Sequence, residues 1–195
     1  MINNNHSTTF PEIVETFEHQ HPEIFYDIAV PKKTVLLQQG KIADRIYIIR
    51  DGALRLWHST SDGRDITLQF FLSGQIVSSF ESFYLNVPSN FSLETLSDCT
   101  LSYAAREDIL PLLTNDDYYQ HFLTDYTCHR LIVYINLFLS RIEYSPEDRY
   151  LQLLHERPEL LEQIPHHYIA SYLGISATSL SRIRRRIAEE HNEKI

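Results

Sequence analysis

Cysteine is scarce in this chain, and the scarcity excludes a class of fold. Cys99 and Cys128 are the only two cysteines among 195 residues, so the protein does not depend on a framework of disulfide bonds. Residues 1–20 show no basic start followed by an apolar run, which is the pattern of an export signal. The longest apolar run, residues 131–139, is broken by Asn136 and is far too short to span a membrane. These absences predict a reduced, cytoplasmic protein with no membrane partner.

Acidic residues are missing from one stretch of an otherwise acidic protein. The chain has a formal net charge of −9 at pH 7, yet residues 163–188 contain no Asp or Glu. Four arginines lie in that stretch: Arg182, Arg184, Arg185 and Arg186. A local basic surface on an acidic chain is typical of a site kept for an anionic partner.

Glycine is also rare, and its placement indicates strands and turns. Four of the five glycines lie between Gly40 and Gly74, at intervals of about 11 residues. The segments within residues 34–103 are short, rich in β-branched and aromatic residues, and mostly separated by turn residues. Asp-Gly pairs at residues 51–52 and 62–63 are strong signals for tight turns. This part of the chain predicts an all-β barrel or a double-sheet roll.

A long helix is expected over residues 115–144. Asn115 and the two aspartates after it suit a helix start, and the later half of the segment is apolar nearly all round. Such a helix must be covered on both sides. The β domain covers one side, and a second copy of the helix is the simplest cover for the other, which predicts a parallel two-fold dimer. The alternative is a helix enclosed entirely by its own domain.

A break follows the long helix. Ser145 and Asp148 can form a capping arrangement around Pro146, which suits the first helical position. Four short helices are expected after the break, over residues 146–155, 158–162, 166–173 and 176–190.

The last two of these helices have the layout of a helix-turn-helix. Gly174 takes the turn, Ile175 fills the angle between the helices, and Ser176 caps the second helix. Three apolar residues of the second helix form a narrow stripe that faces the first helix. Its other side carries small polar residues first and arginines further along, which suits the major groove of double-stranded DNA.

The expected DNA contacts all lie on that outer side: Thr178, Ser179, Ser181, Arg182, Arg185 and Arg186. Arg182 is the candidate for base contact, since a guanidinium can bind both acceptors of a guanine. Arg185 and Arg186 are candidates for phosphate contacts, which bring affinity without sequence information. Arg184 lies nearer the core edge and is expected at a phosphate or a neighbouring carboxylate. The alternative is a solvated basic face on a terminal helix.

Three domains follow from these patterns. Residues 1–114 are expected to form a β-roll sensory domain with an N-terminal helix. Residues 115–144 are expected to form a dimerisation helix, and residues 145–195 a helix-turn-helix DNA-binding domain.

With these parts in this order, the chain resembles the CRP/FNR family of bacterial transcription regulators, the cyclic-AMP receptor type. The resemblance runs from about Val30 to Ile187 and is most specific at residues 40–56 and in YIASYLGISATSLSRIRRRI. It implies an α+β fold with an N-terminal cyclic-nucleotide-binding-like β-roll, a long dimerisation helix and a C-terminal winged helix-turn-helix. It also implies a homodimer that binds pseudo-palindromic operators and contacts RNA polymerase.

The nucleotide site of the family is degenerate in this sequence. Cyclic-nucleotide-binding members carry Gly-Glu where this chain has Ser78 and Ser79, and Arg-Ser where it has Asn90 and Phe91. Without the arginine, a buried phosphate has no charge partner, which is costly. Tyr134 stands where members present a hydroxyl to the base. We expect these five residues to mark an effector pocket that takes a small apolar molecule other than cyclic AMP, or no effector at all.

No cofactor is expected. Two cysteines cannot hold the four-cysteine iron–sulfur cluster of the redox members of the family. Cys128 is expected to be an inert buried thiol, with a position facing its twin across the dimer as the alternative. A haem ligand at His121 or His129 is a rarer alternative to a partly exposed structural histidine.

Two rival functions stay open. A metal-dependent enzyme of the cupin type needs three convergent histidines, and neither His58 nor the pair His19 and His21 has a further ligand at convincing spacing. Nucleophile signatures and phosphate loops are absent from the sequence, so no catalytic and no metal-binding residues are expected. The second rival is a ligand-binding or protein-interaction module of β-roll type without sequence-specific DNA binding, which the acidic net charge permits.

Overall fold

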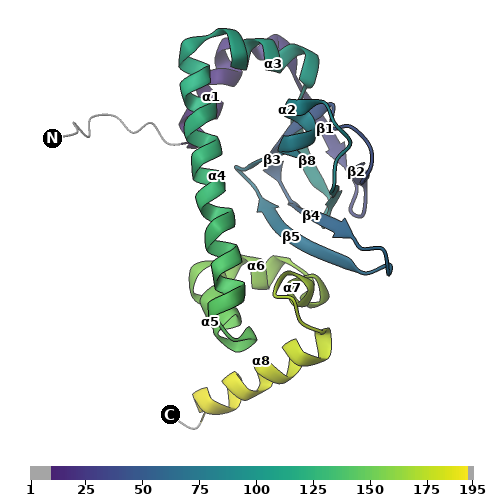
Figure 1. Cartoon of the computed structure of the whole chain (residues 1–195), viewed down its shortest axis with the longest axis vertical. Helices are drawn as coiled ribbons and strands as arrows, with labels where there is room; N and C mark the ends of the chain where they lie inside the picture. The colour runs from purple at the N-terminus through teal and green to yellow at the C-terminus, as the bar shows by residue number, and fades with distance from the viewer. Residues whose placement is uncertain (1–9, 193–195) are drawn as a thin grey trace, which may run out of the picture.

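Two four-stranded antiparallel sheets form a roll in the computed structural model, which describes residues 10–192 (Figure 1). The first sheet has the strand order β1-β8-β3-β6 and the second the order β2-β7-β4-β5. The strands are β1 Phe25–Val30, β2 Val35–Leu37, β3 Arg45–Asp51, β4 Ala53–Ser59, β5 Asp65–Leu72, β6 Ile76–Val77, β7 Ser92–Thr95 and β8 Cys99–Ala105.

Helices surround the roll at both ends and along one side. The helices are α1 Phe10–Gln20, α2 Phe80–Leu85, α3 Arg106–Asn115, α4 Asp117–Glu143, α5 Pro146–Glu156, α6 Pro158–Gln163, α7 His166–Tyr172 and α8 Ala177–Asn192, with a 3₁₀ turn at Pro22–Ile24. The 27 residues of α4 make a rod of about 40 Å that runs from α1 and α3 at one end to α5 and α6 at the other (Figure 1). Within residues 10–192, none of the helices combines the length and hydropathy that a membrane span requires.

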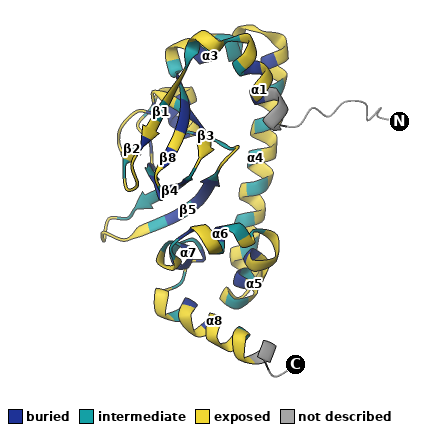
Figure 2. Ribbon diagram, turned by 180° about the vertical axis from the view of Figure 1, so that it is seen from behind, coloured by how far each residue is buried: buried dark blue, intermediate teal, exposed yellow. Residues whose placement is uncertain are grey.

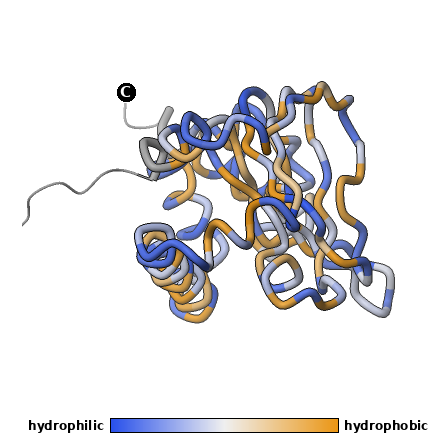
Figure 3. The backbone as a smooth tube through the Cα atoms, turned by 90° about the horizontal axis from the view of Figure 1, so that it is seen from above, coloured by the Kyte–Doolittle hydropathy of each residue, from blue (hydrophilic) through white to orange (hydrophobic). Residues whose placement is uncertain are grey.

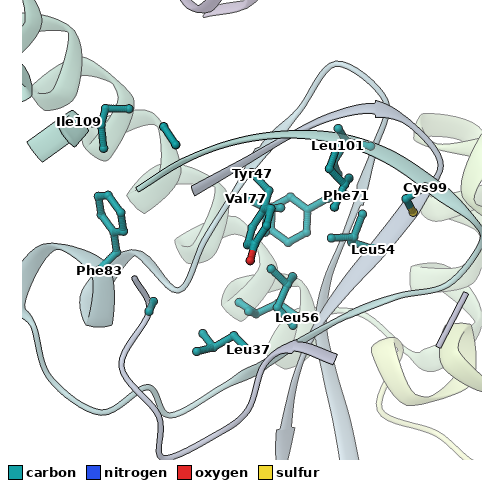
Figure 4. Close-up of a cluster of buried hydrophobic side chains, with 14 of the residues drawn as sticks. Leu37, Tyr47, Leu54, Leu56, Phe71, Val77, Phe83, Cys99, Leu101 and Ile109 are labelled. Atoms are coloured by element: carbon teal, nitrogen blue, oxygen red, sulfur yellow. The ribbon is translucent and has the colours of Figure 1, made fainter. Parts of the chain in front are cut away.

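Two hydrophobic cores hold these parts together. In the first, Leu54 and Leu101 from facing sheets are fully buried, and Figure 4 shows such side chains gathered inside the roll. In the second, Phe70 of β5 packs with Ile169 of α7 and Leu180 of α8. Burial of apolar surface is the main favourable term in folding, so the second core fixes the C-terminal helices against the roll.

The predicted fold class is confirmed, with one part missing. The roll, the long helix and the helix-turn-helix are present, but residues 106–192 contain helices only, so the described chain has no β-hairpin wing. The physical reason lies in the sequence after Ser176, where no glycine or proline interrupts a single helix up to Asn192. The outer limits of the predicted domains, residues 1 and 195, lie outside the described residues. So do residues 1–9 of the segment 1–20, in which no export signal is expected.

The long helix begins differently from the prediction. Asn115 ends α3, and Asp116 caps α4 by accepting hydrogen bonds from the backbone N–H groups of Tyr118 and Tyr119. The break after α4 is as predicted, because the Ser145 side chain and Asp148 form a reciprocal capping box.

Gly52 lies where the chain passes from one sheet to the other. The Asp51-Gly52 pair does not form the tight hairpin turn that the sequence predicts, because β3 and β4 belong to different sheets. The φ angle of Gly52 is +105°. A Cβ atom there would lie 2.5 Å from Cys99 Sγ, 2.8 Å from the Asp98 carbonyl oxygen and 2.9 Å from Ser97 Oγ.

Gly52→Ala is therefore expected to lower the free energy of unfolding by more than about 2 kcal/mol, through both backbone strain and steric clash. Urea unfolding of the purified protein measures the change. Gly40→Ala is the matched control, because Gly40 also has a positive φ of +85° but has no atom within 4 Å of the added Cβ. Equal losses in the two variants would contradict the role of the close contacts.

Candidate nucleic-acid interface and effector cavity

Helices α7 and α8 form a helix-turn-helix with the predicted turn and cap. Gly174 has a φ of +70°, and the backbone N–H of Ile175 donates to the Ala170 carbonyl at 3.0 Å. Ser176 Oγ accepts a hydrogen bond of 3.1 Å from the backbone N–H of Ser179. This bond satisfies a helix N–H that has no partner within the helix, so α8 begins where the sequence predicts.

The predicted contact residues share the outer face of α8. Five of the six are exposed, and the sixth, Ser179, is half-buried. The Ser179 hydroxyl lies 2.9 Å from the Ser176 hydroxyl and accepts a hydrogen bond of 3.4 Å from Arg182. Leu180 and Ile183 are buried on the opposite face. The structure thus brings the six residues together, and their roles at DNA stay predictions.

Two arginines have environments that differ from the expected ones. Arg186, expected at a phosphate, forms an ion pair with Glu147 of α5. Arg184, expected nearer the core edge, is exposed, and no carboxylate of the described residues lies within ion-pair distance of it. Because Arg186 is already paired with Glu147, Arg184 is more available to an anion than Arg186. Burial is the main cause that holds the pKa of His166 below its ordinary value, and the nearby charges of Arg184 and His167 lower it further.

Helix α7 is docked on the free edge of the second sheet. Ser171 Oγ accepts from the backbone N–H of Thr67 at 2.9 Å and donates to the Asp65 carbonyl at 2.8 Å. The Ser171 hydroxyl thereby pairs two backbone groups of β5 that have no neighbouring strand, because β5 lies at the edge of its sheet. One turn earlier, the Tyr168 ring covers the Arg55 guanidinium at 4.1 Å from the ring centroid. The roll therefore contacts the first helix of the helix-turn-helix directly.

The end of α4 is also joined to the helix-turn-helix. Arg141 donates to the Tyr172 carbonyl at 3.1 Å, and Arg149 donates to the Leu173 carbonyl at 3.0 Å. Arg149 also donates to the Tyr144 carbonyl at 2.8 Å. These bonds connect the C-terminal ends of α4 and α7, directly through Arg141 and by way of α5 through Arg149.

A cavity of about 480 Å³ lies between the roll and α4. Its walls are mostly apolar and include Phe71 of β5, Phe91 and Phe122 of α4. Burial raises the pKa of Tyr126, which lines the same cavity. The volume is within the usual range for small-molecule sites.

Four of the five predicted pocket residues line this cavity: Ser78, Ser79, Phe91 and Tyr134. Asn90 does not, because its side chain is exposed and its carbonyl lies 2.8 Å from Nδ1 of His58, away from the cavity walls. Their roles in binding an effector stay predictions.

The two serines of the cavity wall already have partners in the protein. The buried Ser79 hydroxyl accepts a hydrogen bond of 2.7 Å from the Ser89 hydroxyl. The Ser78 hydroxyl donates to the Arg45 carbonyl at 2.9 Å. Each hydroxyl therefore has one partner within the protein, and neither supplies the carboxylate that cyclic-nucleotide-binding relatives are expected to carry at this position.

Sequence reasoning missed Arg130, which also lines the cavity. Its spacing of four residues from both Tyr126 and Tyr134 places the three side chains on one face of α4. The sequence signal for Arg130 is a single arginine between two tyrosines at a spacing of four residues.

An adjacent face of α4 carries exposed apolar side chains, of which Leu131 also lines the cavity (Figure 2). Leu131, Ile135, Phe138 and Ile142 are 58%, 47%, 64% and 67% exposed, and Figure 3 shows hydrophobic residues on the turns of this helix. Their spacing of four, three and four residues is that of a coiled-coil seam. Cys128 lies three residues before Leu131 and is exposed, so the expectation of a buried thiol is wrong for this chain.

The histidines considered as ligands are not gathered into a metal site. His121 and His129 are both exposed on α4. Across the part of the chain that the structure describes, no cluster of three or more His, Cys, Asp or Glu side chains has the geometry to hold a metal ion.

Comparisons with known proteins agree with this architecture. Residues 28–116 match the family model of the cyclic nucleotide-binding domain. The cyclic AMP receptor protein of Thermus thermophilus is 25% identical over 168 residues, which cover 82% of this chain and 76% of that protein. The structure of FixK2 from Bradyrhizobium japonicum superposes with a TM-score of 0.76 at 18% identity and covers 86% of each chain. CLP of Xanthomonas campestris, a c-di-GMP responsive global regulator, gives a TM-score of 0.72 at 19% identity over 91% of this chain and 93% of its own.

The fold and these matches define a protein with a cyclic nucleotide-binding β-roll followed by a helix-turn-helix. The chain is similar to CRP/FNR-type transcription regulators in sequence and in fold, which confirms the resemblance drawn from its sequence.

Proposed function

We propose that the protein binds DNA as a homodimer, with the two α8 helices in successive major grooves of a pseudo-palindromic operator. The outer face of α8 carries this proposal, because it presents Arg182 and Arg185 to solvent while Leu180 and Ile183 fix the helix from behind. Small side chains at the start of such a helix allow the backbone to approach the bases. The family resemblance supports a further contact with RNA polymerase.

The seam on α4 supports the homodimer. An exposed stripe of large apolar side chains costs free energy in water, and a second copy of α4 would cover it with identical residues. A parallel two-fold pair places each residue of the seam next to its twin. The domain boundaries at residues 114 and 145 are proposed on the same grounds: α4 dimerises, the roll senses, and the last helices bind DNA.

The cavity supports an effector other than cyclic AMP. Its serines are already hydrogen-bonded within the protein, and Asn90 is not among the residues that line it. The effector would act by shifting α4 and so, through Arg141 and Arg149, the distance between the two α8 helices.

Selection from a random duplex pool tests the proposal. The purified protein is expected to enrich an inverted repeat with half-sites about 34 Å apart, and the enriched duplex is then titrated with salt. Each phosphate contact should make the slope of log affinity against log salt more negative by about 0.9.

Arg182→Ala is expected to weaken binding to the enriched duplex by roughly tenfold or more and to relax the preference at one base position, because a bidentate guanine contact is lost. Arg64→Ala is the matched control: it removes an equal charge from the exposed β4–β5 loop, where Arg64 pairs with Asp62. An equal loss of affinity in both variants would show that only net charge matters and would contradict the base contact.

The alternative is a module of β-roll type that binds a ligand or a protein without sequence-specific DNA binding. The ion pairs of Arg186 with Glu147 and of Arg185 with Glu189 favour it, because they occupy two of the basic side chains. For this module we expect no enriched sequence and a flat salt dependence.

A further inference from the structure

The walls of the cavity between the roll and α4 suit an apolar molecule. Phe71, Phe91 and Phe122 are among the residues that line it, and the hydroxyls of Ser78 and Ser79 are engaged within the protein. The sugar hydroxyls of a nucleotide would lose their water here without gaining enough partners, which costs free energy for each group. The cavity therefore disfavours a nucleotide or a sugar for a reason separate from the missing phosphate-binding arginine.

Arg130 brings a positive charge to the wall of this apolar cavity. It is the one lysine or arginine among the described residues that line the cavity, and it is half-buried. Its guanidinium carbon lies 4.9 Å from the centroid of the Tyr134 ring and 5.8 Å from that of Phe71. Glu81, the acidic residue of the lining, is exposed.

The hydrogen-bond partners of Arg130 are neutral. The guanidinium donates to the Tyr134 hydroxyl at 2.8 Å and to Oε1 of Gln69 on β5. Arg130 takes part in none of the ion pairs among the described residues, so none of their carboxylates lies within 4 Å of its guanidinium nitrogens. A charged donor in a site of low polarity interacts more strongly with a carboxylate than with an amide or a hydroxyl.

We infer that the cavity binds an apolar carboxylic acid, with its hydrocarbon body against the aromatic walls and its carboxylate on Arg130. This inference deepens the proposed function and rests on it for its regulatory meaning, because it names the chemical class of the effector. It combines the two properties of the cavity, an apolar volume and a single cation without an anionic partner.

The acid would also change how α4 is held. The bond from Arg130 to Gln69 connects α4 to the second sheet, and a carboxylate would take the place of the Gln69 oxygen. The ligand would therefore break the direct hydrogen bond between α4 and β5 and would itself contact Arg130 of α4 and the walls of the cavity. This is a differential contact of the kind that a ligand needs in order to shift a conformational equilibrium.

Calorimetric titration of the full chain tests the inference with defined probes. Decanoate carries its carboxylate on an aliphatic chain, and 4-phenylbutyrate carries the same group on an aromatic one. The probe with the higher affinity shows which kind of hydrocarbon the cavity prefers. At least one is expected to bind with a Kd below about 1 mM. 1-Decanol, which lacks the charge, is expected to bind roughly tenfold to a hundredfold more weakly than decanoate.

Two variants separate the role of Arg130 from a general effect on folding. Arg130→Gln is expected to weaken binding of the acid by roughly tenfold to a hundredfold without changing that of 1-decanol, and Arg130→Lys should restore part of the loss. Thermal unfolding of both variants reports whether the fold is intact. Tyr134→Phe keeps the ring beneath the guanidinium and is expected to retain binding.

Several outcomes overturn the inference: no binding of either acid, equal affinity for decanoate and 1-decanol, or equal affinity of Arg130→Gln and the parent protein for the acid. Because calorimetry needs no DNA, the result is independent of the duplex selection. Binding of the acid with no duplex enriched either in its absence or in its presence would overturn the proposed function alone. An enriched duplex without binding of the acid would overturn this inference alone.

Discussion

Phe138→Glu combined with Ile142→Glu is expected to convert the proposed dimer into a monomer. The two side chains are the most exposed apolar residues of the α4 seam, at 64% and 67%. In a parallel pair, the substitution would place four carboxylates in one short stretch of the interface and remove its largest apolar contacts. The repulsion between the carboxylates and the loss of the apolar contacts each cost more than about 1.5 kcal/mol. The dissociation constant of the dimer should therefore rise at least roughly a hundredfold.

Sedimentation equilibrium or light scattering behind a sizing column measures this change. His129→Glu with Asn136→Glu is the matched control, because it adds the same charge at exposed positions of α4 that lie away from the seam. The control should stay dimeric. A parent protein that is already monomeric, or a seam variant that stays dimeric, would contradict the assignment of this face.

Cys128 tests the register of the two helices. It occupies the seam position before Leu131 and is exposed, so a parallel two-fold pair would bring the two thiols to a separation that a disulfide can bridge. Mild oxidation is expected to give a covalent dimer on a non-reducing gel, and Cys128→Ser should give none. A non-covalent dimer without this cross-link would indicate antiparallel helices.

Arg55→Ala is expected to lower the free energy of unfolding by about 3–5 kcal/mol, the largest effect on stability among these variants. Arg55 is only 4% exposed. Its Nε atom lies 2.5 Å from Oε1 of Glu94, and its guanidinium is 3.6 Å from the Asp65 carboxylate and 3.3 Å from the Thr67 hydroxyl. Removal of the arginine would leave Glu94, whose side chain is 13% exposed, without its charge partner.

Chemical unfolding of the variant, compared with the double substitution Arg55→Leu with Glu94→Leu, measures the effect. The double variant should recover a large part of the loss, because it removes both buried charges and leaves apolar side chains of similar length. A double variant as unstable as Arg55→Ala would mean that packing of Arg55 against Tyr168, and not the pairing of charges, carries the stability.

Several elements could be predicted from local pattern, and others could not. The Asp62-Gly63 turn, the capping box at Ser145 and the turn at Gly174 depend on residues within a few positions of each other, and all three are present. Strand β7 and helix α2 are too short for a clear period, so neither was expected. Helix α3 contains Pro111, which obscured it.

The candidate sites divide in the same way. The six residues on the outer face of α8 follow from helical periodicity alone, since a helix places them on one side whatever surrounds it. The partner of Arg186 on α5 and the location of Asn90 away from the cavity do not follow from any local pattern. These depend on how separate elements pack.

By itself, the sequence determined the strand-and-turn character of the first half, the helical second half, the cap and turn of the helix-turn-helix, and the apolar character of the long helix. Each of these arises from backbone and side-chain preferences acting over a few residues. Only the tertiary structure decided that Ser171 pairs with a strand edge 104 residues away and that Arg130 reaches Gln69 across 61 residues to complete a cavity. Contacts at such separations carry no periodic signal in the chain, because they form only when the two cores bring distant elements together.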